Sequence, residues 1–206
     1  IFLNKKIKLF LQVGSGTEYE KKRSPHKENF VCNPKSIYAR PKFLATNFLI
    51  KKHKQTNFPF TVVRLYQIFG EKQDSNRIIP FIIRSCLNDK DFPCSDGSQF
   101  RDFIHIDEVI NAFIKILKNH NKVSGEIINI GSGKPIKLRW LIKKINSLVN
   151  KGKPVFGKIK MRVDEEKKPF PSIIKAKKIL EWKPKNNFLI KLKKVIYHEK
   201  KNFTGN

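Results

Sequence analysis

Two short stretches decide how this sequence is interpreted: VGSGTEYE, Val13 to Glu20, and YARPK, Tyr38 to Lys42. The first follows an apolar run, IKLFLQV, and holds two glycines beside small hydroxyl residues. An apolar run that ends in glycines predicts a buried strand followed by a turn. The question is whether these glycines hold a phosphate, form an ordinary turn, or present part of an active site.

Apolar strands alternate with amphipathic helices along the rest of the chain. This alternation predicts an α/β fold with a mainly parallel sheet. Strands are expected at 7–13, 60–66, 100–106 and 126–130, with a turn at 95–98. Helices are expected at 36–53 with Ser36 as N-cap, at 77–87, at 107–119 with Asp107 as cap, at 138–148, at 173–180 and at the basic C-terminal end.

The formal net charge of +27 suggests a nucleic-acid-binding module as an alternative function. Eight of the 44 basic residues are arginine and 36 are lysine, and the lysines are scattered through every segment. Bidentate contacts to phosphates and bases favour arginine, so this composition argues against specific nucleic-acid recognition. The alternative is kept as a second hypothesis.

Other features of the composition limit the class of protein. No apolar run reaches the roughly 18–20 residues that a membrane-spanning helix needs. Cys32, Cys86 and Cys94 lack the spacing of metal ligands, and their odd number argues against a disulfide framework. We therefore expect a cytoplasmic protein with reduced thiols, no metal site and no membrane partner.

Tyr38 and Lys42 lie four residues apart on a predicted helix, so their side chains share a face. An ammonium beside a phenol favours the phenolate, which can take or give a proton. A strand-end hydroxyl, Ser15 or Thr17, is placed to hydrogen-bond a substrate oxygen. This trio suits oxidation of an alcohol, in which the tyrosine takes the proton and a cofactor accepts hydride. A Tyr/Lys pair with this spacing is more often a surface pair, so the interpretation depends on the neighbouring motifs.

Those motifs resemble the extended short-chain dehydrogenase/reductase family, which includes the NAD-dependent nucleotide-sugar epimerases and dehydratases. VGSGTEYE resembles the strand end that carries the family's catalytic Ser/Thr, and Ser15 falls on that position. SIYARPKFLAT resembles the active-site helix, with Tyr38 as catalytic base and Lys42 as its partner. Further blocks follow in the family's order: FTVVRLYQIFG, NRIIPFII, FRDFIHIDEV, EIINIGSGKPIKL and KAKKILEWKPK.

The resemblance implies a fold and a cofactor. The fold would be the C-terminal part of a Rossmann-like doubly wound parallel sheet plus a smaller α/β substrate-binding domain. Residues 1–76 would hold the remnant of the NAD(P)-binding domain, and 77–206 mainly the substrate domain, with helix 107–119 packing back on the first part. NAD or NADP would contact Tyr38, Lys42 and Gly14, and Lys42 would hold the nicotinamide ribose. A homodimer formed through the active-site helix is typical of the family.

The resemblance also implies a nucleotide-diphosphate sugar as substrate. Arg101 and Arg162 would contact the diphosphate, since an arginine fork suits phosphate oxygens. His105 is expected to be a structural strand residue rather than a catalyst. The remaining substrate contacts would come from Thr17, Gln67, Asn76 and Arg77.

The sequence departs from the family pattern at several places. No GxxGxxG or GxGxxG follows an N-terminal strand, so the chain is expected to be a fragment that is incomplete for catalysis by itself, and an inactive remnant is an alternative. Pro41 stands where the family commonly has Ser, just past the first turn of a helix that starts at Ser36. Gly16–Thr17 replaces the Asp–Glu pair of 4,6-dehydratases, which favours epimerisation or 4-keto reduction over 4,6-dehydration.

Overall fold

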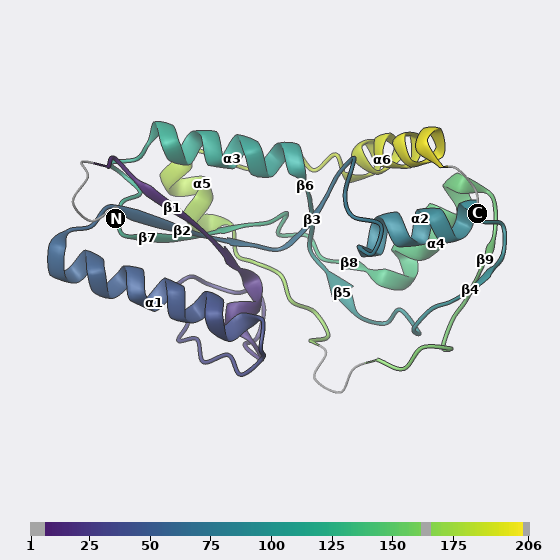
Figure 1. The fold of residues 1–206 in the computed structure, drawn as a ribbon, viewed down its shortest axis with the longest axis horizontal. Helices are drawn as coiled ribbons and strands as arrows, with labels where there is room; N and C mark the ends of the chain where they lie inside the picture. Colours follow the sequence, from purple (N-terminus) through teal and green to yellow (C-terminus); the bar gives the residue numbers. More distant parts are fainter. Residues whose placement is uncertain (1–6, 162–165, 204–206) are drawn as a thin grey trace.

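The protein forms two groups of elements that lie end to end along its long axis (Figure 1). The computed structural model describes residues 7–161 and 166–203. The first group is built on a parallel sheet with the strand order β1-β2-β7, which confirms the predicted α/β class. Its strands are β1 (Phe10–Ser15), β2 (Phe60–Leu65) and β7 (Glu126–Ile130).

The register of the sheet brings the carboxyl ends of its strands to one edge. Ser15 pairs with Leu65, and Leu65 pairs with Ile130. The 3-10 helix η1 (Gly16–Tyr19) follows β1 at once. The carboxyl edge of an open parallel sheet is where α/β proteins bind their ligands. Strand β1 was predicted at 7–13. It runs from Phe10 to Ser15, so it begins and ends later than expected and includes Gly14 and Ser15.

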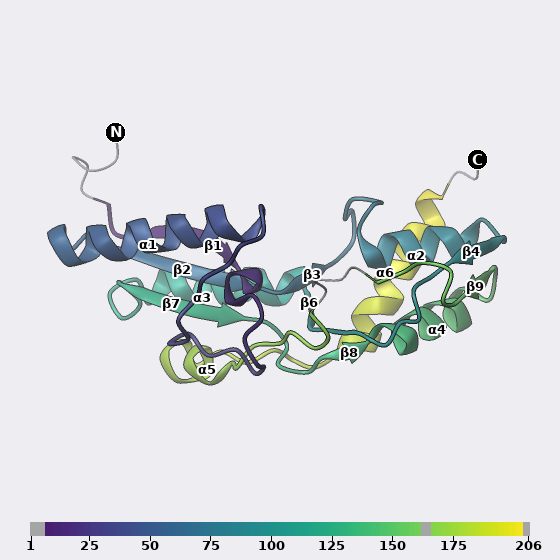
Figure 2. The same ribbon diagram turned by 90° about the horizontal axis from the view of Figure 1, so that it is seen from below.

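Helices cover both faces of the sheet. In Figures 1 and 2, α1 (Ala39–Thr56) lies on one face, and α3 (Ile106–Lys118) and α5 (Ile174–Leu180) lie on the other. Successive strand side chains point to opposite faces, so Val62 packs on the α1 side and Val63 on the α3 side. The first group therefore combines β1, α1 and β2 with β7, α3 and α5, which come from later in the chain.

The second group is a helical cluster with short strands around it. Ile83, Leu141, Ile145 and Leu192 lie in its buried apolar cluster. Its helices are α2 (Ile78–Leu87), α4 (Leu138–Val149) and α6 (Phe188–Asn202). The short pairs are β3 (Gln67–Phe69) with β6 (Phe103–His105), β4 (Asp91–Pro93) with β9 (Lys153–Val155), and antiparallel β5 (Phe100–Arg101) with β8 (Ile136–Lys137). In Figure 1, β3 and β6 lie between the two groups.

The regular helix α1 begins three residues later than predicted. A turn precedes it, in which the Ala39 N–H donates to Ser36 Oγ at 3.2 Å and the Arg40 N–H donates to the Ser36 carbonyl at 3.0 Å. Pro41 is the third residue of α1, where a backbone N–H needs no intrahelical partner. The expectation that Pro41 lies past the first turn is therefore wrong.

The cap of α3 also differs from the prediction. His105, not Asp107, precedes the helix, and its ring Nδ1 accepts a hydrogen bond from the Asp107 N–H at 3.2 Å. Strand β6 continues to His105, so the strand passes straight into the helix and Asp107 falls in the first turn. His105 is thus a structural strand-end residue, as expected. Helix α1 also ends at Thr56, three residues later than predicted, and the boundaries of α2, α4 and α5 agree with the prediction within about one residue.

Within residues 7–161 and 166–203, no helix has the length and apolarity needed to cross a bilayer. The same residues contain no group of three or more His, Cys, Asp or Glu side chains arranged around a metal position. All three cysteines are free thiols and are buried.

Candidate functional site

Ser15 lies at the carboxyl end of β1, where only 8% of its surface is exposed. Its Oγ accepts hydrogen bonds from the Thr17 N–H at 3.2 Å and from Thr17 Oγ1 at 2.9 Å. The hydroxyl hydrogen of Ser15 has no acceptor in the described part of the chain. Ser15 can therefore donate this hydrogen to an oxygen of a bound molecule.

Lys42 reaches the same strand end from α1. Its Nζ donates to the Val13 carbonyl at 3.0 Å, two residues before Ser15. Tyr38 directly precedes α1, is 63% exposed and makes no side-chain hydrogen bond to a described residue. The structure thus holds the Lys42 ammonium against β1 two residues before Ser15, and it leaves the Tyr38 phenol exposed directly before α1.

The two glycines of VGSG make room for buried side chains. A Cβ on Gly14 would lie 2.6 Å from Glu18 Oε1, and a Cβ on Gly16 would lie 2.7 Å from the Tyr66 ring. These contacts account for both glycines without a phosphate, and the stretch opens a four-residue 3-10 helix rather than a dinucleotide-binding α-helix. The contact between Gly14 and a cofactor stays a prediction.

Glu18 and Arg64 form a buried ion pair behind Ser15. Glu18 is fully buried, and Arg64 is 2% exposed. Arg64 Nε and Nη2 lie 3.1 and 3.0 Å from Glu18 Oε2, and the guanidinium carbon lies 4.5 Å from the centre of the Tyr19 ring. This pair was not predicted from the sequence. The S-x-x-E spacing of Ser15 and Glu18 indicates the capping box that they form around η1, but it does not indicate the contact with Arg64.

Tyr19 is the other tyrosine of the two motifs, and it is unsuited to proton transfer. It is fully buried, and its hydroxyl donates to Asn129 Oδ1 at 2.8 Å. Burial raises the pKa of Tyr19 to about 12, so the phenol stays protonated at neutral pH. Of these two tyrosines, Tyr38 is therefore the candidate base.

Arg101, on β5, is connected to the region after β1 through Glu166. Arg101 Nη1 donates to the carbonyls of Phe100 at 2.6 Å and Glu166 at 2.9 Å, and the Lys21 N–H donates to Glu166 Oε1 at 2.8 Å. This chain of contacts places Arg101 on the side of the molecule where β1 ends. The other predicted substrate residues Thr17, Gln67, Asn76 and Arg77 are exposed, and Arg162 lies outside the described residues.

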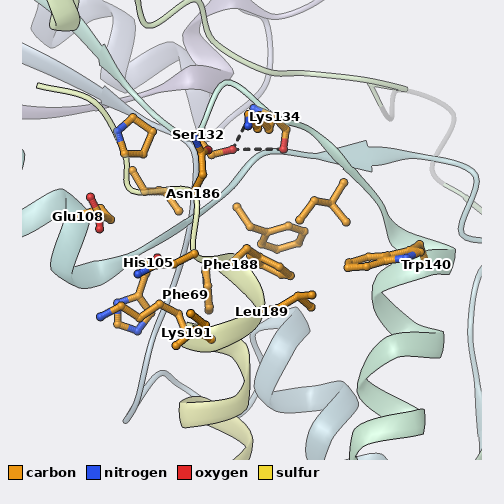
Figure 3. Close-up of a pocket in the computed structure, with 16 residues that line it drawn as sticks. Phe69, His105, Glu108, Ser132, Lys134, Trp140, Asn186, Phe188, Leu189 and Lys191 are labelled. Carbon is orange, nitrogen blue, oxygen red and sulfur yellow. Dashed lines mark hydrogen bonds between the residues drawn. The ribbon is translucent and has the colours of Figure 1, made fainter.

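A cavity of about 420 Å³ lies apart from these residues, at the start of α6. Figure 3 shows Phe188 near its centre, Trp140 to one side, and His105 and Lys191 to the other. Aromatic rings form much of its wall, and the centres of the Phe69 and Phe188 rings are 5.1 Å apart. Its lining includes none of Ser15, Tyr38, Lys42 and Arg101, so the cavity is separate from the strand-end site.

Comparison with known proteins identifies relatives with nucleotide-sugar chemistry. The chain is 27% identical to CDP-abequose synthase of Salmonella muenchen, over 72% of this chain and 63% of that protein. It is 30% identical to UDP-glucuronate 4-epimerase of Thermodesulfobacterium geofontis, over 86% of this chain and 54% of that protein. The chain thus spans less than two thirds of the length of these relatives.

Solved structures show the same fold. UDP-glucuronic acid 4-epimerase from Bacillus cereus, in complex with UDP-glucuronic acid and NAD, superposes with a TM-score of 0.89 at 24% identity. The match covers 97% of this chain and 64% of that one. The family model described as "NAD dependent epimerase/dehydratase family" matches residues 2–131. The chain belongs to this NAD-dependent epimerase/dehydratase family.

Proposed function

We propose that this chain carries the substrate side of an NAD(P)-dependent nucleotide-sugar epimerase or 4-keto reductase that moves hydride at a sugar carbon, C4. The observation that carries the proposal is the hydrogen bond from Lys42 Nζ to the Val13 carbonyl, which ties α1 to β1 two residues before Ser15, with the exposed Tyr38 directly before α1. Such an edge is the usual ligand position in an open parallel sheet. The family membership and the nucleotide-sugar names of the relatives support the same substrate class.

Each of the three residues has a distinct role. Ser15 donates its free hydroxyl hydrogen to the sugar oxygen and orients it. Tyr38 takes the proton of that hydroxyl as the C–H bond breaks, which leaves a keto sugar, and it returns the proton when hydride comes back. Lys42 favours the phenolate of Tyr38 and holds the nicotinamide ribose. Bound nicotinamide supplies the acceptor and donor of hydride.

The residues present fit one end of this cofactor. The Lys42 ammonium, held at the end of β1 by the Val13 carbonyl, is a suitable donor to ribose hydroxyls. The pyrophosphate is normally held by a glycine-rich turn at a helix N-terminus, and the 206 residues contain no such motif. Under this proposal, the groups that hold the pyrophosphate come from outside these residues.

The preference for epimerisation or 4-keto reduction rests on the strand end. Gly16 and Thr17 stand where 4,6-dehydratases carry Asp and Glu, and the next residue, Glu18, is fully buried with both carboxylate oxygens hydrogen-bonded. No acidic side chain of η1 is therefore free to protonate a leaving group.

Arg101 and Arg162 would bind the diphosphate, and Thr17, Gln67, Asn76 and Arg77 would contact the rest of the substrate. A homodimer and a cytoplasmic location belong to the same proposal.

Replacement of the phenol tests this function. The chain would be joined to the dinucleotide-binding part of a relative and assayed with UDP-, CDP- and dTDP-sugars and both nicotinamide cofactors. We expect Tyr38→Phe to lower turnover by about 10²- to 10⁴-fold, because it removes the proton acceptor. Tyr197→Phe is the matched control, since Tyr197 is 71% exposed on α6 and should leave turnover unchanged. Unchanged turnover in Tyr38→Phe would show that the catalytic assignment is wrong, and an inactive parent would favour the inactive remnant.

A further inference from the structure

The carboxylate of Glu18 joins the three elements that surround the strand-end site. Its Oε1 accepts the Ser15 N–H at 2.9 Å, at the end of β1. Its Oε2 accepts the Thr46 hydroxyl of α1 at 2.9 Å and Arg64 Nε of β2 at 3.1 Å. Glu18 therefore contacts both the strand end that presents Ser15 and the helix that carries Lys42.

The surroundings of Glu18 are built to hold this carboxylate. Gly14 lacks the Cβ that would approach Oε1 to 2.6 Å, and Arg64 supplies a buried positive charge. Thr46 is 1% exposed, and Glu18 is fully buried. The described partners of the carboxylate all lie on regular elements, which are β1, α1 and β2.

We propose that Glu18 is a positioning residue, which fixes the Ser15 hydroxyl relative to the Tyr38/Lys42 end of α1. This inference rests on the proposed function. Catalysis by a strand-end hydroxyl and a helix-borne base requires a fixed separation between strand and helix, since a displacement of about 1 Å can cost about 100-fold in rate. The Glu18–Thr46 hydrogen bond is the direct polar link between η1 and α1 that controls this separation.

A purely structural role, as the counter-ion of Arg64, is the competing explanation. Thr46 separates the two explanations, because its hydroxyl joins Glu18 to α1 without taking part in the ion pair. Thr46→Val removes this link and leaves Glu18 and Arg64 paired. Thr46→Ser keeps a hydroxyl at the same position and should restore the link.

Thr61→Val is the matched control. Thr61 is fully buried on β2, and its hydroxyl donates to the Val123 carbonyl at 2.6 Å, near the opposite end of the strand. This substitution also removes a buried hydroxyl, without touching the strand-end site. Thr46→Val loses in addition the contact of the same hydroxyl with the Lys42 carbonyl of α1 at 3.1 Å, which Thr46→Ser keeps.

The first measurement is amide hydrogen exchange on the 206-residue chain. We expect Thr46→Val to speed exchange about tenfold or more in residues 15–18 and 39–46, with normal rates in Thr46→Ser and in Thr61→Val for these segments. Equal acceleration in Thr46→Val and Thr61→Val, or acceleration spread over the whole chain, would overturn the proposal.

The second measurement is turnover in the assembled enzyme described above. We expect Thr46→Val to lower kcat about 10- to 100-fold with an unchanged KM for the nucleotide sugar, and Thr46→Ser to recover most of it. An unchanged kcat in Thr46→Val would overturn the positioning role. If the parent enzyme shows no turnover, the proposed function fails by itself, and hydrogen exchange still decides whether Glu18 couples η1 to α1.

Discussion

The carboxylate of Glu18 is fully buried behind the strand end, where it accepts the Ser15 N–H. Its partner Arg64 is 2% exposed, so loss of the guanidinium leaves a negative charge buried without its counter-ion. We expect Arg64→Ala to lower the free energy of unfolding by about 3–5 kcal/mol. Urea denaturation of the variant and the parent measures this change.

Two further variants separate the ion pair from general packing. Glu18→Leu combined with Arg64→Met leaves no unpaired charge. The double variant should therefore lose less unfolding free energy than the two single substitutions added together. Lys175→Met removes one partner of the half-exposed pair with Glu126 and should cost no more than about 1 kcal/mol. An Arg64→Ala cost as small as that of Lys175→Met would show that the buried pair does not stabilise the fold.

At this scale the candidate reactive groups could be predicted from the sequence, and the side chains that pack behind them could not. Ser15, Tyr38 and Lys42 were chosen from residue type and spacing, which the sequence displays directly. The role of Gly14 could not be predicted, because its need for space comes from Glu18 folding back on the strand and from Val62 on the neighbouring strand. The capping-box spacing from Ser15 to Glu18 was readable, whereas the contact with Arg64 joins residues 46 positions apart.

At the scale of elements, Asp102 holds the turn after β7 against the region between β5 and β6. It is 1% exposed, and its carboxylate accepts hydrogen bonds from the Ser132 N–H at 2.6 Å and the Ser132 hydroxyl at 2.9 Å. Burial raises the pKa of Asp102 from 3.8 to about 6. The folded protein therefore holds this proton more tightly than the unfolded chain does.

The sign of the resulting pH dependence follows from this difference. The stabilisation that Asp102 contributes is fully present below about pH 4, and roughly 3 kcal/mol of it is lost as the pH rises through 6. We expect Asp102→Asn to remove this dependence, so that the difference in unfolding free energy between parent and variant changes between pH 4 and pH 7. Glu28 and Glu166 also have raised pKa values because of burial, but they are present in both proteins and cancel. A difference that stays constant with pH would contradict the assignment.

Element boundaries were predicted well where the hydrophobic pattern alone determines them. They were predicted less well where a particular residue, such as a proline or a capping side chain, determines them. Strand β7 matches the predicted 126–130, because it is a short, isoleucine-rich run between glycine-containing turns. Helix α1 begins at Ala39 and not at the predicted Ser36, because Pro41 lacks the backbone N–H that would continue the preceding turn as regular helix. The exposed Leu44 and Phe48 lie four apart on α1, and the homodimer formed through this helix stays a prediction.

At the scale of the whole molecule, the order of the sequence blocks was enough to predict the class of fold. Strand–helix alternation gives a parallel sheet, and the register of β1, β2 and β7 places their ends at one edge. The family resemblance predicts that helix 107–119 packs back on the first group, but the sequence did not show that β7 and α5 join it there, because this depends on long-range packing of Val63 with Ile128 and Trp182. The cavity beside Phe188 was missed for the same reason.

We expect the strand-end site and Arg101 to bind a nucleotide-diphosphate sugar. Calorimetric titration of the 206-residue chain with UDP-, CDP- and dTDP-sugars near physiological salt tests it most directly. Duplex and single-stranded DNA serve as competitors, since a net charge of +27 attracts any polyanion at low salt. We expect saturable one-site binding of a nucleotide sugar that weakens at least about tenfold in Arg101→Ala and is not displaced by DNA. Absence of nucleotide-sugar binding, together with DNA binding that persists at this salt, would contradict it.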